Sequence, residues 1–164
     1  MSELKLAISN IAWDKADDEA VYAAMQQNGF TGLEIAPTRI FPEYPYENLT
    51  GAALFGGYLL NRWGFHVPSM QSIWYGQTGN IFDPVQAEEL LDYTAEAFQF
   101  AHTINCPSLV FGCPKNRSVP EGGRPEDAAP RRRATPFLPR PVRWRPTMMW
   151  CLPLRPIPRY TPTT

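Results

Sequence analysis

The chain has 164 residues, enough for one domain, and a net charge of −1 that conceals two unlike parts. Residues 1–117 carry six Lys and Arg against thirteen Asp and Glu, whereas residues 118–164 carry nine Arg, no Lys and three acids. Eleven of the eighteen prolines also fall in the second part. A break in composition this sharp predicts a boundary near residue 117. We expect residues 1–117 to form one folded unit and residues 118–164 to be a Pro/Arg-rich tail.

Cysteines and hydropathy exclude several classes of protein. Cys106, Cys113 and Cys151 are odd in number and lack paired spacing, which argues against a disulfide framework and fits a reducing compartment. The first residues show no basic segment followed by an apolar run, so no signal peptide is expected. No apolar stretch approaches the ~18 residues of a membrane span. We therefore expect a cytoplasmic protein without membrane contact.

The first 48 residues predict a strand, a helix, a second strand and a loop. Leu4–Ser9 is a short apolar run typical of a buried strand. Asp14–Asn28 has acids in its first turn and Gly29 just after its end, which are the start and stop signals of a helix. Gly32–Ala36 is a second apolar run and predicts a strand. The three prolines of residues 37–48 predict a loop.

The next segment predicts a weaker helix and a third strand. Gly51–Trp63 is apolar, but its three glycines each lower helix stability by up to about 1 kcal/mol. Phe65–Gln71 predicts a strand, in which Pro68 removes one hydrogen-bond donor. Residues 73–82 predict a loop.

The strongest helix signal follows this loop. Asp83 is an N-cap residue, Pro84 fits the first helical position, and Gln86 completes a capping-box-like pair with Asp83. Apolar residues at helical spacing continue to about residue 104, and Ser108–Gly112 predicts a fourth strand.

Strands that alternate with helices indicate a parallel sheet with right-handed crossovers. Both a (β/α)8 barrel and a doubly wound sheet fit this order. No G-x-G-x-x-G follows the first strand, so the usual dinucleotide fingerprint is missing. The pattern alone leaves the two architectures open.

Three motifs favour the barrel. They are GFTGLEIAPTR (29–39), VPSMQSIWYG (67–76) and NCPSLVFGCPKNR (105–117). Together and in this order they resemble the xylose-isomerase-like TIM-barrel superfamily, in the branch of the sugar phosphate isomerases/epimerases. The resemblance covers about residues 1–117. It implies an α/β fold made of the first four βα units of a (β/α)8 barrel, which is incomplete because a whole barrel needs about 250 residues.

The resemblance also implies a chemistry. In this family a divalent cation, Mn²⁺, Mg²⁺ or Co²⁺, polarises the carbonyl and hydroxyl of an open-chain sugar, and carboxylates move a proton between adjacent carbons. The family's metal ligands come mainly from strands five to eight, which this chain does not continue into. Whether the chain is an enzyme therefore stays open: the alternatives are a sugar (phosphate) isomerase/epimerase, or an inactive truncated fragment of one.

The tail admits three interpretations. If Leu154–Thr163 are given permitted codons and read two nucleotides out of frame, the result can be Ala-Glu-Ala-Asn-Pro-Pro-Ile-Tyr-Thr-Asn, which resembles the family's fifth strand. A frameshift between Ser118 and Arg131 is therefore one interpretation, and a disordered extension is another. Arg131–Arg133 with Trp144 and Trp150 would suit a basic nucleic-acid-binding arm, the third and least favoured alternative.

Active sites of this fold lie where strands end and loops begin. At those positions we expect substrate contacts, weighed in each case against a purely structural role in packing, capping or charge solvation. The candidate substrate-binding residues are Trp13, Glu34, Arg39, Gln71, Ser72, Trp74, Lys115, Asn116 and Arg117. No catalytic residue and no metal ligand is assigned.

Four strands do not close a barrel. The first and fourth strands would each leave an open edge, which invites pairing with another chain. We expect the protein either to aggregate or to associate with itself through the open half-barrel.

Overall fold

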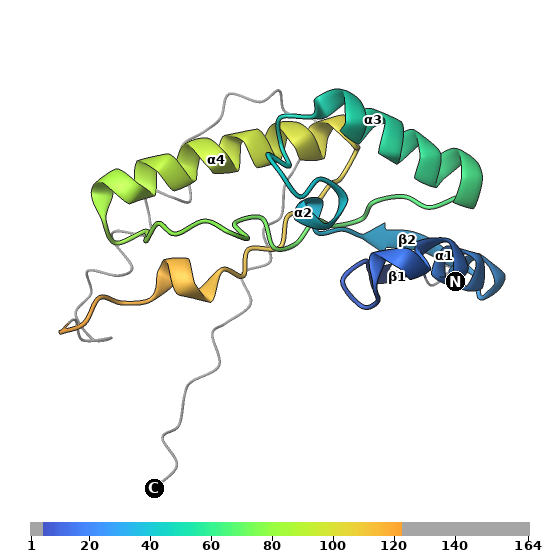
Figure 1. The fold of residues 1–164 in the computed structure, drawn as a ribbon, viewed down its shortest axis with the longest axis horizontal. Coiled ribbons are helices and arrows are strands. Elements are labelled where there is room, and N and C mark those ends of the chain that lie inside the picture. The colour runs from blue at the N-terminus through green and yellow to red at the C-terminus, as the bar shows by residue number, and fades with distance from the viewer. Residues whose placement is uncertain (1–4, 123–164) are drawn as a thin grey trace, which may run out of the picture.

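The computed structural model describes residues 5–122. The elements in chain order are β1 (Leu6–Ser9), η1 (Lys15–Asp17), α1 (Asp18–Gln27), β2 (Phe30–Glu34), α2 (Pro37–Ile40), α3 (Leu49–Tyr58), η2 (Leu59–Trp63), α4 (Pro84–Thr103) and η3 (Pro114–Arg117). Figure 1 shows α4 and α3 along one side of the fold, in contact near the end of α4, with the extended segments running beneath them. Within the described part of the chain, no helix is both long and apolar enough to cross a membrane.

The sheet is parallel, and its extended segments follow the chain order. Strand β1 pairs with β2, with Ser9 opposite Glu34. Beyond β2 the pairing continues as isolated parallel bridges, from Gly32 to His66, from Ile35 to Met70 and from Met70 to Leu109. Segments 65–71 and 108–112 are therefore extended neighbours in the sheet but are not continuous strands. Pro68 helps to explain this difference from the prediction, since it lacks the N–H that a ladder needs at that position.

Helix signals in the sequence are confirmed with shifted boundaries. The Asp83 carboxylate accepts hydrogen bonds from the amides of Val85 and Gln86, which caps α4 as predicted. Helix α1 begins at Asp18 after the short η1, and Gly29 follows its end with φ 75°, a left-handed conformation that glycine adopts without strain.

Two other segments differ from the sequence prediction. Pro37 starts a short helix, α2, inside the expected loop, because proline at the first helical position costs no hydrogen bond. The weak helix is divided: α3 is capped by Asn48, whose side-chain oxygen accepts from the Gly51 amide at 2.8 Å, and it continues as the π-helical turn η2.

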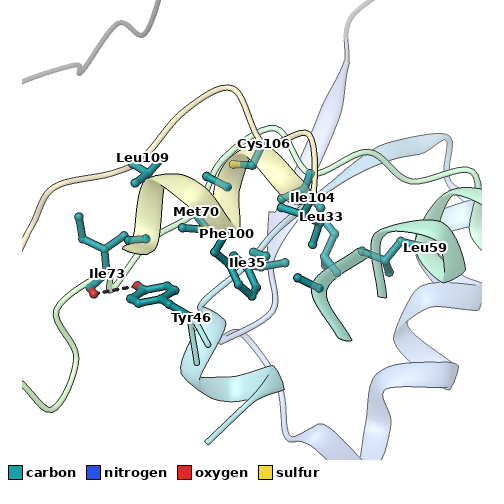
Figure 2. Close-up of a cluster of buried hydrophobic side chains, with 14 of the residues drawn as sticks. Leu33, Ile35, Tyr46, Leu59, Met70, Ile73, Phe100, Ile104, Cys106 and Leu109 are labelled. Atoms are coloured by element: carbon teal, nitrogen blue, oxygen red, sulfur yellow. Dashed lines mark hydrogen bonds between the residues drawn. The ribbon is translucent and has the colours of Figure 1, made fainter. Parts of the chain in front are cut away.

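The core lies between the sheet and the helices α3 and α4, as Figure 2 shows. Leu33 of β2, Ile35 just after it and Met70 of the next segment are fully buried, and they pack with Phe100 of α4. The Tyr46 hydroxyl donates to the Ile73 carbonyl at 2.8 Å, so this loop tyrosine is satisfied inside the core. A Cβ on Gly56 would lie 2.9 Å from Ile104 Cγ1, so glycine permits the close approach of α3 to the end of α4.

Candidate functional site

Two adjoining cavities lie beside the loops that follow the extended segments. The first has a volume of about 790 Å³ and the second about 720 Å³. They share Ser72, Tyr75, Gly76 and Gln77, which all belong to the loop after segment 65–71. A cavity beside the carboxyl ends of parallel strands is the usual position of a ligand site in α/β folds. We therefore describe both cavities as one candidate site.

The first cavity has an aromatic and apolar wall. Tyr44 is 72 % exposed, Tyr75 is 71 % exposed and Ile11 is 56 % exposed, and all three line the cavity. Trp13 and Tyr93 complete this wall. Large apolar groups left this open are informative, because surfaces without a binding role seldom gather them together.

Two residues that line the first cavity, Tyr44 and Ser72, have a strained backbone conformation. Tyr44 has φ 47° and Ser72 has φ 55°, both in the left-handed region that residues with a side chain seldom adopt. Prolines 42 and 45 flank Tyr44 and also line the cavity. Strained residues of this kind concentrate at binding sites, where the surrounding structure holds them in place.

Arg39 and Trp13 are tied together by Asp18. The Arg39 guanidinium donates to both Asp18 carboxylate oxygens, at 2.7 and 3.3 Å, and to the Trp13 carbonyl at 3.2 Å. The Trp13 indole N–H donates to Asp18 at 2.7 Å, and the Arg39 guanidinium lies 5.6 Å from the centre of a Trp13 ring. Arg39 therefore lines the cavity with its charge already paired, and the cluster fixes the orientation of the Trp13 ring.

The second cavity brings a cation and a buried amide close to Ser72. Lys115 is exposed and lines the cavity, while Asn116 is only 5 % exposed. The Asn116 side-chain amide donates to the carbonyls of Gln77 at 3.0 Å and Gly79 at 2.7 Å. Asn116 therefore holds the loop of residues 77–79 in position and leaves Lys115 as the free charged group of this wall.

Burial explains the direction of the pKa shifts in this region. Burial raises the pKa of the Tyr93 hydroxyl above its ordinary value, against the opposing effect of a hydrogen bond with Gln77. Burial likewise raises the pKa of the Cys113 thiol, and nearby backbone groups and Arg117 oppose the shift. Both groups are therefore held in their neutral forms near pH 7.

Trp74 and Arg117 contribute mainly to packing. Trp74 is 2 % exposed, its indole N–H donates to Thr94 at 2.8 Å, and its ring meets Phe111 edge-on at 4.6 Å. Arg117 lies over the Phe111 ring at 5.4 Å and is half-buried. Trp74 still borders the second cavity, whereas Arg117 lines neither of the two.

Glu34 and Gln71 lie outside both cavities. The Ser69 hydroxyl donates to Glu34 at 2.6 Å, and the Gln71 amide donates to the Ser9 hydroxyl at 2.8 Å. These four half-buried polar residues come from β1, β2 and the third segment, and we call them the polar sheet patch. Glu34 pairs with Ser69 and Gln71 pairs with Ser9, so each of these hydrogen bonds joins two different extended segments of the sheet.

Asn10 is a buried polar residue that the sequence did not single out by itself. It is fully buried, its side-chain oxygen accepts from the Ala36 amide at 2.9 Å, and its backbone amide donates to the Glu34 carbonyl at 2.9 Å. Its side-chain nitrogen has no partner among the described residues. Asn10 thus joins the end of β1 to the end of β2.

The implied divalent metal does not find a set of ligands in residues 5–122. No group of three or more His, Cys, Asp or Glu side chains comes together in this part of the chain in a way that could hold a metal ion. The Glu34 carboxylate, at the end of β2, accepts a hydrogen bond from Ser69. These residues do not fit a metal centre, and we derive no chemical step through one.

The structure unites the sequence candidates in two groups. Trp13, Arg39 and Ser72 share the first cavity, and Ser72 joins Trp74, Lys115 and Asn116 around the second. Tyr44 and Tyr93 were not among the candidates. The two flanking prolines were the available signal for Tyr44, whereas Tyr93 was hidden by its helical spacing among core residues. The tail candidates Arg131–Arg133, Trp144 and Trp150 lie outside the described residues.

No protein-family model matches the chain, and no curated protein matches it either.

Proposed function

We propose that residues 5–117 form the sugar-binding side of a xylose-isomerase-like sugar (phosphate) isomerase/epimerase. In this proposal the parent reaction moves a proton between adjacent carbons of a ketose or aldose. The single observation that carries the binding part is the open aromatic wall of Trp13, Tyr44 and Tyr75 beside the polar side chains of Ser72 and Gln77.

This combination of groups suits a sugar. The C–H faces of a sugar are apolar and lie well against aromatic rings, while its hydroxyls need hydrogen-bond partners at the edges. A cavity of about 790 Å³ is in the range of small-molecule sites and is larger than one sugar needs. Lys115, in the adjoining cavity, is the group that would favour a phosphorylated sugar.

Turnover is a separate question from binding. The resemblance assigns the metal ligands to strands five to eight, so we propose that this chain binds a sugar and does not isomerise it by itself. An assay with added Mn²⁺, Co²⁺ or Mg²⁺ over a panel of ketoses decides between the enzyme and the inactive fragment, since turnover by this chain would refute the fragment.

Binding is tested with the intact chain by saturation-transfer NMR, using free and phosphorylated ketopentoses and ketohexoses as probes. We expect saturation transfer to the sugar C–H protons, and we expect Tyr75→Ala to weaken it because this ring is open to solvent. Leu54→Ala is the matched control, since Leu54 is 71 % exposed on α3 and lines neither cavity. Equal signals from all three proteins, or none from the parent chain, would contradict the proposal.

A second variant separates the two kinds of sugar. Lys115→Gln should weaken binding of the phosphorylated sugars and leave the free sugars unchanged, because only a phosphate gains from the ammonium charge. If Lys115→Gln changes neither, Lys115 does not contact the ligand.

A further inference from the structure

The two edges of the sheet are formed by different segments of the chain. The extended segments follow the order β1, β2, 65–71 and 108–110, the last being the part of segment 108–112 that pairs with Met70, and all the pairings are parallel. Within residues 5–122, strand β1 therefore forms one edge of the sheet, and segment 108–110 forms the other. In Figure 1, β1 lies near the N-terminus, and the yellow-to-orange chain after α4 runs through the middle of the fold and then away from β1 into the orange turn of η3.

Unused backbone groups lie along both edges. The Met70 amide donates to the Ser108 carbonyl at 2.9 Å, and the Met70 carbonyl accepts from the Val110 amide at 2.7 Å. Since alternate residues of a parallel strand bond to opposite neighbours, the N–H and C=O of Leu109 point to the outer side. No backbone partner for Leu109 is found in the described part of the chain.

The same alternation applies at β1. The backbone amide of Asn10 donates to the Glu34 carbonyl at 2.9 Å, so the backbone groups of Ile8 and Asn10 face β2. The backbone N–H and C=O of Ala7 therefore face the outer side of the sheet. The strand also exposes apolar surface, since Leu6 is 37 % exposed and Ala7 is exposed. An uncovered edge of this kind is a template for pairing with another strand.

We propose that the partner is a second copy of this chain, with β1 of each copy beside segment 108–110 of the other. A twofold axis generates both junctions at once, and each copy then uses its two unlike edges once. Eight parallel segments would form one closed sheet, which leaves no edge for further growth. This inference does not depend on sugar binding.

Charge complementarity specifies the partner. In parallel pairing, the loops that follow two neighbouring strands leave from the same end of the sheet. The segment after β1, which includes η1, carries exposed Asp14 and Asp17 with the exposed cation Lys15 between them, so it is net acidic, and we call it the acidic loop. The segment after 108–110 carries exposed Lys115 and half-buried Arg117. The proposed junction brings this acidic loop beside this basic loop, twice in each pair. A second copy therefore supplies the charges that each edge lacks.

The first measurement is the mass of the intact chain by analytical ultracentrifugation in low salt over a range of concentrations. We expect a reversible dimer of the 18.6 kDa chain that stops at two copies. A monomer at every concentration, or open-ended growth beyond two copies, would overturn the proposal.

Charge swaps test which surfaces meet. The double variant Asp14→Lys/Asp17→Lys places lysines opposite the partner's Lys115, and Lys115→Glu places a carboxylate opposite the acidic loop. Each variant alone should dimerise about 10-fold more weakly, because close like charges oppose association. An equal mixture should recover the dimer, since each junction of the mixed pair again joins opposite charges.

Matched controls make the outcome specific. Asp92→Lys/Glu96→Lys brings the same change of charge to two exposed positions of α4, outside both junction loops, and should leave the dimer unchanged. Circular dichroism of every variant reports whether it folds, and Ala7→Pro tests the edge itself, since it removes an outward N–H and no β2 hydrogen bond. A dimer that none of these edge changes weakens would use another surface, which would refute the inference.

Discussion

The two faces of the sheet contribute differently to stability, although their residues alternate along the same stretch of chain. Leu33 and Ile35 face the helices and are fully buried, whereas Glu34 between them belongs to the half-buried polar sheet patch. The helix-covered face buries apolar area, from which most folding free energy derives. The other face satisfies its polar groups within itself. Mutations one residue apart should therefore have effects of very different size.

The largest effect is expected on the helix-covered face. Leu33→Ala should lower the free energy of unfolding by about 2–5 kcal/mol, because it removes buried methyl groups and leaves a cavity. Urea denaturation followed by circular dichroism measures this change. Leu54→Ala, at a position 71 % exposed, is the matched control and should stay within about 0.5 kcal/mol. Similar losses for both leucines would mean that the sheet and helices do not form a common core.

The reactivities of two thiols offer a second comparison, between Cys106 in the core and Cys113 beside the candidate site. Burial raises the pKa of Cys106 from 9.0 to about 11, and its Sγ lies 3.2 Å from the Ser108 carbonyl. Because the thiolate is the reactive form, a shift of this size lowers its population at pH 8 about 100-fold. Burial raises the pKa of Cys113 as well, but this thiol is half-buried beside the second cavity, whereas Cys106 is only 1 % exposed.

We therefore expect iodoacetamide to label Cys113 well before Cys106 at pH 8. Fragmentation mass spectrometry distinguishes the two sites in one peptide, and labelling in denaturant should make their rates equal. Faster labelling of Cys106 in the folded protein would show that the end of α4 opens readily.

The third effect concerns the contact between β1 and its neighbours. A Cβ on Gly32 would lie 2.8 Å from Ala7 Cβ and 3.2 Å from Pro68 Cγ. Gly32→Ala should therefore cost about 1–3 kcal/mol, the usual range for overpacking. Gly57→Ala is the matched control with the opposite sign, because its Cβ would meet nothing closer than Asn61 at 4.0 Å and alanine favours the helix by up to about 1 kcal/mol. Stabilisation by both changes would show that β1 can move away from Gly32.

Local signals made the helices easier to predict than the sheet. Asp83, Pro84 and Gln86 specify the start of α4 through bonds within one turn, so the sequence was sufficient there. Segments 65–71 and 108–112 depend on pairing with residues far along the chain, and their pairing reduces to isolated bridges. The start of α2 at Pro37 was missed because three nearby prolines read as a loop.

In the candidate site, too, positions were easier to predict than long-range contacts. The positions after each strand made Trp13, Ser72 and Lys115 candidates for substrate contact, and the structure places all three beside cavities. Substrate contact itself stays a prediction. Sequence could not tell that Asp18 pairs with Arg39, because this pair joins residues 21 positions apart. Nor could it separate Gln71 from Ser72, which are adjacent in sequence and differ in what they contact.

The smallest effect should fall on the polar sheet patch. The Ser69 hydroxyl donates to Glu34 at 2.6 Å, and both side chains are half-buried. Ser69→Ala should lower the free energy of unfolding by about 0.5–1.5 kcal/mol, the net value of one hydrogen bond. A double-mutant cycle with Glu34→Ala isolates the coupling between the two side chains, because each single change also alters its own solvation. A coupling near zero would show that water replaces this bond without loss. A Ser69→Ala loss as large as that of Leu33→Ala would remove the distinction between the faces, since the polar face would then stabilise the fold as strongly as the core.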